Sequence, residues 1–293
     1  MVRSGIKRSL GERLFDWFNI LFMIFLCAVM AYPIIHVTAI AFSSYQESLR
    51  IGLHLWPREI DLTSLEKVFK AGEIWRSYYN TIWRTVVGTT LSVLVTGLGA
   101  YAVSKPYMPL RKTIMSIFLF AMYFSGGMIP QFLLMRSLGL MNNRWAMVLP
   151  SLVWGFNMIV MRNFFMSLPA SMEESAQIDG ANEWLIFFRI VMPLSLPVVA
   201  TIAMWMGVYH WNAYMDNLLY FTDKNMFVLQ RIIRALVVSN SMAGLEGLND
   251  AAVTNPESLK GATILVATVP ILLVYPFLQK YFVKGVMIGA VKG

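Results

Sequence analysis

The stretch LPASMEESAQIDGANEWLIFFRIVMPLSLP, residues 168–197, decides how this chain is organised. Its first half is too polar to cross a bilayer, yet it is too regularly patterned for a plain loop. Ser171 and Glu174 have the spacing of a capping box, which predicts a helix start. Gly180 predicts a helix stop, because glycine tolerates the left-handed conformation that ends helices. Asn182 is expected to cap a second short helix, so two short helices should meet at a glycine.

The sequence around this segment is strongly apolar. Hydrophobic residues make up 57% of the 293 residues and charged residues only 14%, whereas soluble domains carry about 25% charged residues. A water-soluble globule is therefore excluded. Six windows contain no Lys, Arg, Asp or Glu, and each is close to the length of about 20 residues that a membrane-spanning helix needs. They are residues 17–42, 85–104, 113–135, 145–161, 190–215 and 261–279. We expect an all-α membrane protein with six transmembrane helices.

The orientation follows from the basic residues near the predicted helix ends. The first window is longer than a signal-peptide core and no cleavage site follows it, so it should remain in the protein. With the N-terminus in the cytoplasm, the inner segments are richer in Lys and Arg than the outer ones. Both termini are therefore predicted to be cytoplasmic. The single cysteine, Cys27, excludes an internal disulfide.

Several kinds of chemistry are missing from the sequence. There is no Gly-Lys dipeptide, so no phosphate-binding P-loop, and no metal-ligand spacing or catalytic motif is present. No long basic run with interleaved aromatics indicates nucleic acid. The windows contain no carboxylate of the kind that couples a carrier to an ion gradient. Arg84, at a window edge, is expected to be a snorkelling interface residue rather than a pore residue, and His210 a helix–helix hydrogen-bonding partner.

The predicted helix pair carries four acidic residues on the cytoplasmic side: Glu173, Glu174, Asp179 and Glu183. An alternative is a hairpin that only anchors the bundle in the interface. Anionic lipid would repel this cluster, however, so a basic groove on a partner protein fits it better.

This segment resembles the Glu-Ala-Ala signature of permease subunits in bacterial ATP-binding-cassette (ABC) importers. The matching residues, in the family's spacing, are Glu174-Ser175-Ala176, Gly180, Ile190, Met192 and Pro193. Ser175 replaces an alanine of the pattern and Met192 a leucine. The residues around the signature are similar to those of the carbohydrate-uptake branch, the relatives of the smaller maltose permease subunit. Importers of oligosaccharides or polysaccharides, such as the alginate importer, are the nearest sub-branch.

The resemblance implies a type I ABC importer permease fold in the bacterial cytoplasmic membrane. The partners would be a second homologous permease, two ATP-binding subunits, an extracytoplasmic solute-binding protein and a carbohydrate substrate. ATP and Mg would bind the partner subunits, and this chain would hold no cofactor. Residues 79–281 would form the permease core, after an N-terminal part of residues 1–78 and before a tail of residues 282–293. Coupling helices would lie at 171–190, with these residues facing the ATPase: Glu173, Glu174, Ser175, Ala176, Asp179, Gly180 and Ala181.

Span five is the expected wall of the permeation path. Tyr209, Trp211 and Asn212 offer aromatic faces and an amide where a lipid-facing helix would carry aliphatic residues. Aromatics near helix ends also form interface belts, which is the alternative. For the whole chain, the alternative is a stand-alone channel or gradient-driven carrier.

Two further segments have expected roles. The outside loop 216–260 should start with an amphipathic helix around 227–236 and continue as an exposed loop. In the maltose relatives a loop at this place enters the binding protein, which would give Met242, Gly244, Gly247 and Asn249 that role here; a passive connector is the alternative. The resemblance also suggests that the tail, residues 282–293, reaches between the ATPase subunits.

Overall fold

The computed structural model describes residues 9–48, 50, 52–239, 257–270 and 272–273. The described residues form helices and connecting loops, with one isolated bridge between Ser43 and Ile60. The chain divides into two compact units, Met1–Ala71 with Leu248–Thr268, and Gly72–Gly247 with Val269–Gly293. Each unit is described by itself.

The first unit is built on one long helix, α1 (Leu10–Ala41), which starts at a capping box between Ser9 and Glu12. Two short helices follow, α2 (Tyr45–Ser48) and α3 (Thr63–Lys70), and residues 257–268 are also helical. This last helix lies against the end of α1. The Ser258 hydroxyl donates to the Ile40 carbonyl over 2.8 Å, and a Cβ at Gly261 would lie only 3.1 Å from the Ala41 nitrogen.

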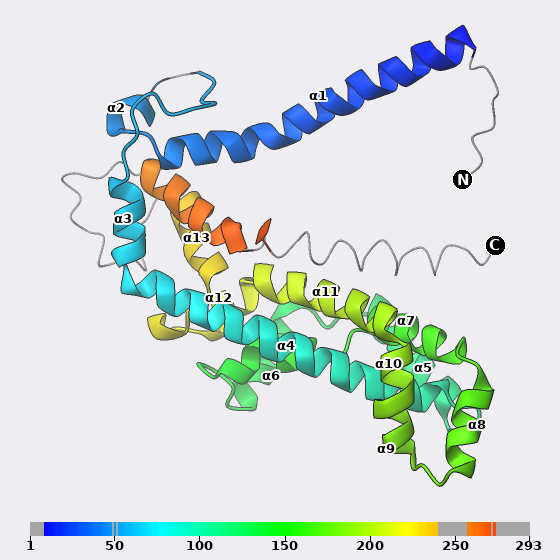
Figure 1. The fold of residues 1–293 in the computed structure, drawn as a ribbon. Coiled ribbons are helices and arrows are strands. Elements are labelled where there is room, and N and C mark those ends of the chain that lie inside the picture. The colour runs from blue at the N-terminus through cyan, green and yellow to red at the C-terminus, as the bar shows by residue number, and fades with distance from the viewer. Residues whose placement is uncertain (1–8, 49, 51, 240–256, 271, 274–293) are drawn as a thin grey trace. The chain divides into compact units, whose positions relative to one another are not determined.

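The second unit holds the remaining helices (Figure 1). Its α-helices are α4 (Gly72–Ser104), α5 (Arg111–Tyr123), α6 (Met128–Ser137), α7 (Gly155–Met166), α8 (Ala170–Ile178), α9 (Glu183–Ile186), α10 (Met192–Leu194), α11 (Leu196–Asn212), α12 (Met215–Tyr220) and α13 (Leu229–Ser239). Short 3₁₀ turns lie at Arg144–Met147, Leu149–Ser151 and Lys224–Met226, and a π-helical segment at Phe187–Val191.

Helix α4 is the centre of the second unit, and α7 and α11 pack along it. Small residues on α4 let its neighbours approach, as in many membrane helix pairs. Gly88 and Gly97 are two of them: a Cβ at Gly88 would meet the His210 ring of α11, and one at Gly97 would touch Met161 of α7. The buried apolar core joins α4, α7, the π-helical segment and α11.

Three of the predicted spans are not single helices. The third is broken into α5 and α6 with a bend of 117° at Gly127, whose φ is +85°. The fourth combines 3₁₀ turns with α7 at a bend of 54°, and the fifth bends by 83° at Ser195. Pro197 explains the fifth break, because its ring lacks an N–H and crowds the preceding turn. The charge-free windows therefore do not reveal that the helices in three of them are broken.

The number of spans stays a prediction. Among the described residues, α1 and α4 are each long and apolar enough to cross a membrane, and five spans are counted if each bent pair is one span. The sixth window lies partly outside the described residues, and so does the predicted tail, residues 282–293. The amphipathic helix expected around 227–236 is confirmed as α13, with Leu229 and Ile232 buried and Arg234 exposed.

Candidate functional site

Helices α8 and α9 form a hairpin that projects from one end of the second unit (Figure 1). Gly180 has a φ of +81°, and the Ala181 N–H donates to the Ala176 carbonyl over 2.9 Å, so α8 ends in the left-handed turn that the sequence predicts. The Asn182 side chain accepts from the Leu185 N–H over 2.9 Å, which confirms it as the cap of α9. The capping box at Ser171 was wrong: α8 already begins at Ala170, directly after Pro169, without a side-chain cap.

The acidic residues of this hairpin divide into two groups. Glu173 and Glu183 face back toward the end of α4. Glu173 forms an ion pair with Lys105, and Glu183 accepts hydrogen bonds from Tyr101 over 2.6 Å and from Tyr107 over 2.9 Å. The bond from Tyr101 is the main reason why the pKa of the Glu183 carboxyl lies below its ordinary value, although burial opposes the shift.

The second group faces outward. Glu174 and Asp179 are exposed, as are Ser175 and Gly180. A Cβ at Gly180 would meet no atom within 4 Å among the described residues, its two chain neighbours aside. Two apolar side chains stand on the same hairpin, Ile178 at 87% exposure and Trp184 at 63%. Ala176 and Ala181 are instead partly buried and pack against the core. We call the exposed set Glu174, Ser175, Ile178, Asp179, Gly180 and Trp184 the outer face.

The outer face combines negative charge with exposed apolar side chains, a composition suited to a protein groove. Beside it lies a hollow of about 580 Å³. Its lining residues come from α8, the π-helical segment and α10: Ser171, Met172, Ser175, Arg189, Ile190, Pro193 and Leu194. A π-helical segment follows α9 directly, and such segments often occur at functional sites.

A second candidate site is a cavity of about 620 Å³ at the break between α11 and α12. Tyr209 and Asn212 of the predicted path line it together with Gln131 of α6. Trp211 is not among its lining residues. Five consecutive residues, 212–216, contribute to the wall, and residues 213–214 among them are non-helical. Irregular backbone at membrane depth is tolerated where it lines a cavity.

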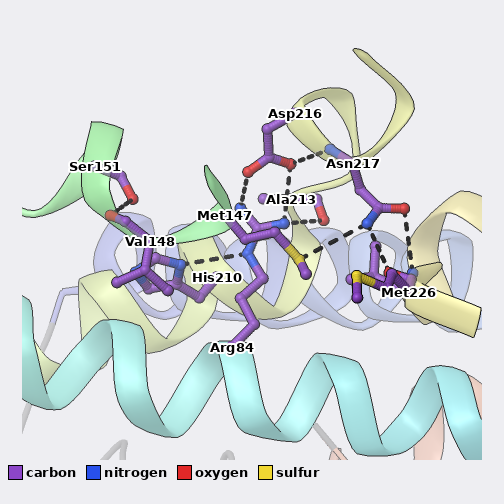
Figure 2. A network of polar contacts seen from close by, with 10 residues as sticks. Arg84, Met147, Val148, Ser151, His210, Ala213, Asp216, Asn217 and Met226 are labelled. Atoms are coloured by element: carbon purple, nitrogen blue, oxygen red, sulfur yellow. Dashed lines mark hydrogen bonds and ion pairs between the residues drawn. The ribbon is translucent and has the colours of Figure 1, made fainter. Parts of the chain in front are cut away.

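A polar network holds this break in place (Figure 2). Arg84 of α4 is completely buried and forms an ion pair with Asp216, at the start of α12. Its Nη1 also donates to the Ala213 carbonyl over 3.0 Å, and its Nε donates to Nδ1 of His210 over 3.4 Å. His210 therefore links two helices, as predicted. The snorkelling expected of Arg84 was wrong, because a carboxylate inside the unit is available to it.

Sequence reasoning missed the partnership between Arg84 and Asp216. The signal was present: Arg84 immediately precedes the second window and Asp216 immediately follows the fifth, and the predicted topology places both at outer helix ends. Two opposite charges at the same depth on neighbouring helices favour an ion pair. Met242, Gly244, Gly247 and Asn249 lie outside the described residues, so their role stays a prediction.

The comparisons with known proteins identify the family. The model of the family "Binding-protein-dependent transport system inner membrane component" matches residues 9–288. The chain belongs to this family. Among similar permeases, the polygalacturonan/rhamnogalacturonan transport system permease protein YtcP of Bacillus subtilis (strain 168) is 40% identical over 284 residues, or 96% of this chain and 99% of that protein. The arabinooligosaccharides transport system permease protein AraQ of Halalkalibacterium halodurans is 28% identical over 283 residues, or 95% and 97%.

A solved permease has the same fold. A chain in the crystal structure of a bacterial ABC transporter involved in the import of the acidic polysaccharide alginate superposes with a TM-score of 0.89 at 34% identity. The match covers 94% of this chain and 99% of that one. The chain is thus an inner-membrane component of a binding-protein-dependent transport system, and the resemblance drawn from the Glu174–Pro193 signature is confirmed.

Proposed function

We propose that this chain is one of two permease subunits in an ABC importer that moves a carbohydrate, an oligo- or polysaccharide, into a bacterial cell. The observation that carries the proposal is the nearly full-length similarity to a polysaccharide permease, at 40% identity. A second homologous permease completes the pathway, a solute-binding protein delivers the sugar, and two partner subunits bind and hydrolyse ATP. Both termini lie in the cytoplasm, and six helices span the membrane.

The outer face of α8 and α9 is the proposed contact with an ATP-binding subunit. Glu174 and Asp179 supply exposed negative charge, and Ile178 supplies an exposed apolar side chain. Behind them, the Glu173–Lys105 ion pair and the bonds of Glu183 tie the hairpin to the end of α4. A displacement of the outer face is therefore transmitted to α4, which carries α7 and α11 with it.

The cavity at the α11–α12 break is the proposed part of the sugar path in this chain. Tyr209, which carries an aromatic ring, lines it, and so do Asn212 and Gln131, which carry amides. Sugar rings stack on aromatic faces, and sugar hydroxyls hydrogen-bond to amides. The similar transport systems serve acidic polymers in some cases and arabinooligosaccharides in another. Hydroxyl groups are common to all these sugars, so the cavity wall would recognise hydroxyls.

Replacing Tyr209 or Asn212 by alanine should change the ranking of sugars that the importer accepts, because each substitution removes a wall group. Uptake of a panel of labelled oligosaccharides by the intact importer measures the ranking. Trp211→Ala is the matched control, since Trp211 lies on the same helix turn without lining the cavity. A changed ranking in the Trp211 variant alone would remove the cavity from the path.

The function itself is tested by reconstitution. The chain, purified with its co-expressed permease, ATP-binding subunits and binding protein, should take up an oligosaccharide into proteoliposomes only when ATP is supplied at the nucleotide-binding side. Uptake by this chain alone, or uptake driven by an ion gradient without ATP, would favour the channel or carrier instead.

A further inference from the structure

The end of α11 is held by one side chain of α4. Ala213 is the residue at which α11 ends, and its carbonyl accepts from Arg84. The carbonyl end of a helix carries partial negative charge, so a guanidinium is well suited to this place. The same guanidinium binds both carboxylate oxygens of Asp216, three residues further on (Figure 2). The planar guanidinium of Arg84 therefore holds the end of α11 and the start of α12, on the two sides of the break.

The break that Arg84 fixes is also the wall of the cavity. Residues 212–216 line the cavity one after another, and two of them, Ala213 and Asp216, are the partners of Arg84. Arg84 itself is not a lining residue and is fully buried. Its effect on the cavity must therefore pass through these two partners.

The network continues beyond the break. The Asn217 N–H donates to Asp216 over 2.7 Å, and the Asn217 side chain donates to the Met226 carbonyl over 2.9 Å. Arg231 of α13 donates to the Asn217 carbonyl over 2.6 Å. The cavity wall is thus joined by hydrogen bonds to α13, the helix that leads into the outside loop predicted to meet the binding protein.

We propose that Arg84 is a positioning residue for the sugar path: by holding Ala213 and Asp216 it sets the shape of the cavity wall, and through Asn217 it couples that wall to α13. This rests on the proposed function, because the path itself is assigned there. A wall held by a buried ion pair keeps one geometry, whereas a non-helical wall without it would sample several.

The contact between α4 and His210 allows a test that touches neither the ion pair nor the cavity. A Cβ at Gly88 would overlap the His210 ring at Nε2, so Gly88→Ala must displace the ring that contacts Arg84. Gly207→Ala is the matched control, since its Cβ would lie 3.7 Å from Thr89 Oγ1 between the same two helices. Both variants add one methyl group to the α4–α11 interface.

Two readouts separate positioning from general stability. The first is sugar uptake per assembled complex, which we expect to fall by roughly fivefold or more in Gly88→Ala, the lower end of ordinary coupling between sites, and to stay at the wild-type level in Gly207→Ala. Arg84→Lys should fall likewise, because lysine keeps the charge but loses the fork. Equal uptake per assembled complex in all variants would mean that the shape of this wall does not affect transport, and would overturn its place in the sugar path. The same holds if the variants lower only the amount of assembled complex.

The second readout does not depend on transport. In a Cys27→Ser background, a cysteine placed by Asn212→Cys should react with a thiol reagent at a different rate once Gly88→Ala is added, and at an unchanged rate once Gly207→Ala is added. A changed rate without any transport effect would support the positioning of the wall and count against the proposed path. An unchanged rate in both would overturn the positioning role.

Discussion

A Gly180→Leu variant should insert and assemble but hydrolyse ATP without importing sugar. Gly180 has a φ of +81°, a conformation that costs an L-residue about 1–2 kcal/mol. Apart from its two chain neighbours, no described residue lies within 4 Å of the added Cβ, so packing against the described part of the chain does not oppose the leucine. The loss of sugar import would instead come from the partner subunit. The leucine side chain would lie on the outer face, where the ATP-binding subunit is proposed to dock.

Gly180→Ala separates the two effects, because alanine carries the same backbone cost with little bulk. We expect Gly180→Ala to retain most of its sugar uptake and Gly180→Leu to lose it, measured as sugar imported per ATP hydrolysed in proteoliposomes. Normal uptake with leucine would contradict the coupling role. If both variants only lowered expression, Gly180 would be no more than a helix terminator.

Glu183→Ala should destabilise the hairpin by about 2 kcal/mol, since the buried Tyr101 hydroxyl would lose its acceptor. Tyr107 and Gln177 lose the same acceptor. Glu174→Ala is the matched control: Glu174 is exposed like Glu183, but the described structure shows no hydrogen bond or ion pair to its side chain, so its loss should leave thermal stability unchanged while weakening association with the ATP-binding subunits. Thermal unfolding in detergent and co-purification of the ATPase measure the two effects. Equal thermal stability in both variants would contradict the anchoring role of Glu183.

The contribution of Glu183 also has a defined pH dependence. Its pKa in the folded protein is below the ordinary value of 4.5. A carboxyl with a lowered pKa stabilises the fold above its unfolded-state pKa, and this contribution is lost as the pH falls through the folded-state value. We therefore expect that lowering the pH from neutral to below 4.5 reduces the free energy of unfolding of the wild type more than that of Glu183→Ala.

The sequence predicted those features of the hairpin that depend on local backbone chemistry. A glycine at a left-handed position and an asparagine before a short helix act through their own backbone and nearest neighbours, so Gly180 and Asn182 could be read directly. The start of α8 could not, because Ser171 satisfies a capping pattern although α8 already begins at Ala170, directly after Pro169.

The contacts that connect distant parts of the sequence were not predictable in this way. Arg84 and Asp216 lie 132 positions apart, and their pairing depends on how α4 and α11 pack. The breaks at Gly127 and Ser195 were likewise hidden, because an uncharged window looks the same whether its helix is continuous or bent. The composition of a segment indicates whether it lies in the membrane or in water, but it does not indicate whether its helix is straight or bent.

Cross-linking from the outer face tests the central claim most directly. With Cys27, the single cysteine, changed to serine, Glu174→Cys in the assembled importer should cross-link to an ATP-binding subunit through a short bifunctional thiol-to-amine reagent. Tyr123→Cys, at a side chain that is 81% exposed on α5, should not. A cysteine at 174 that reacts with the reagent yet yields no ATPase adduct would contradict the coupling role of this hairpin.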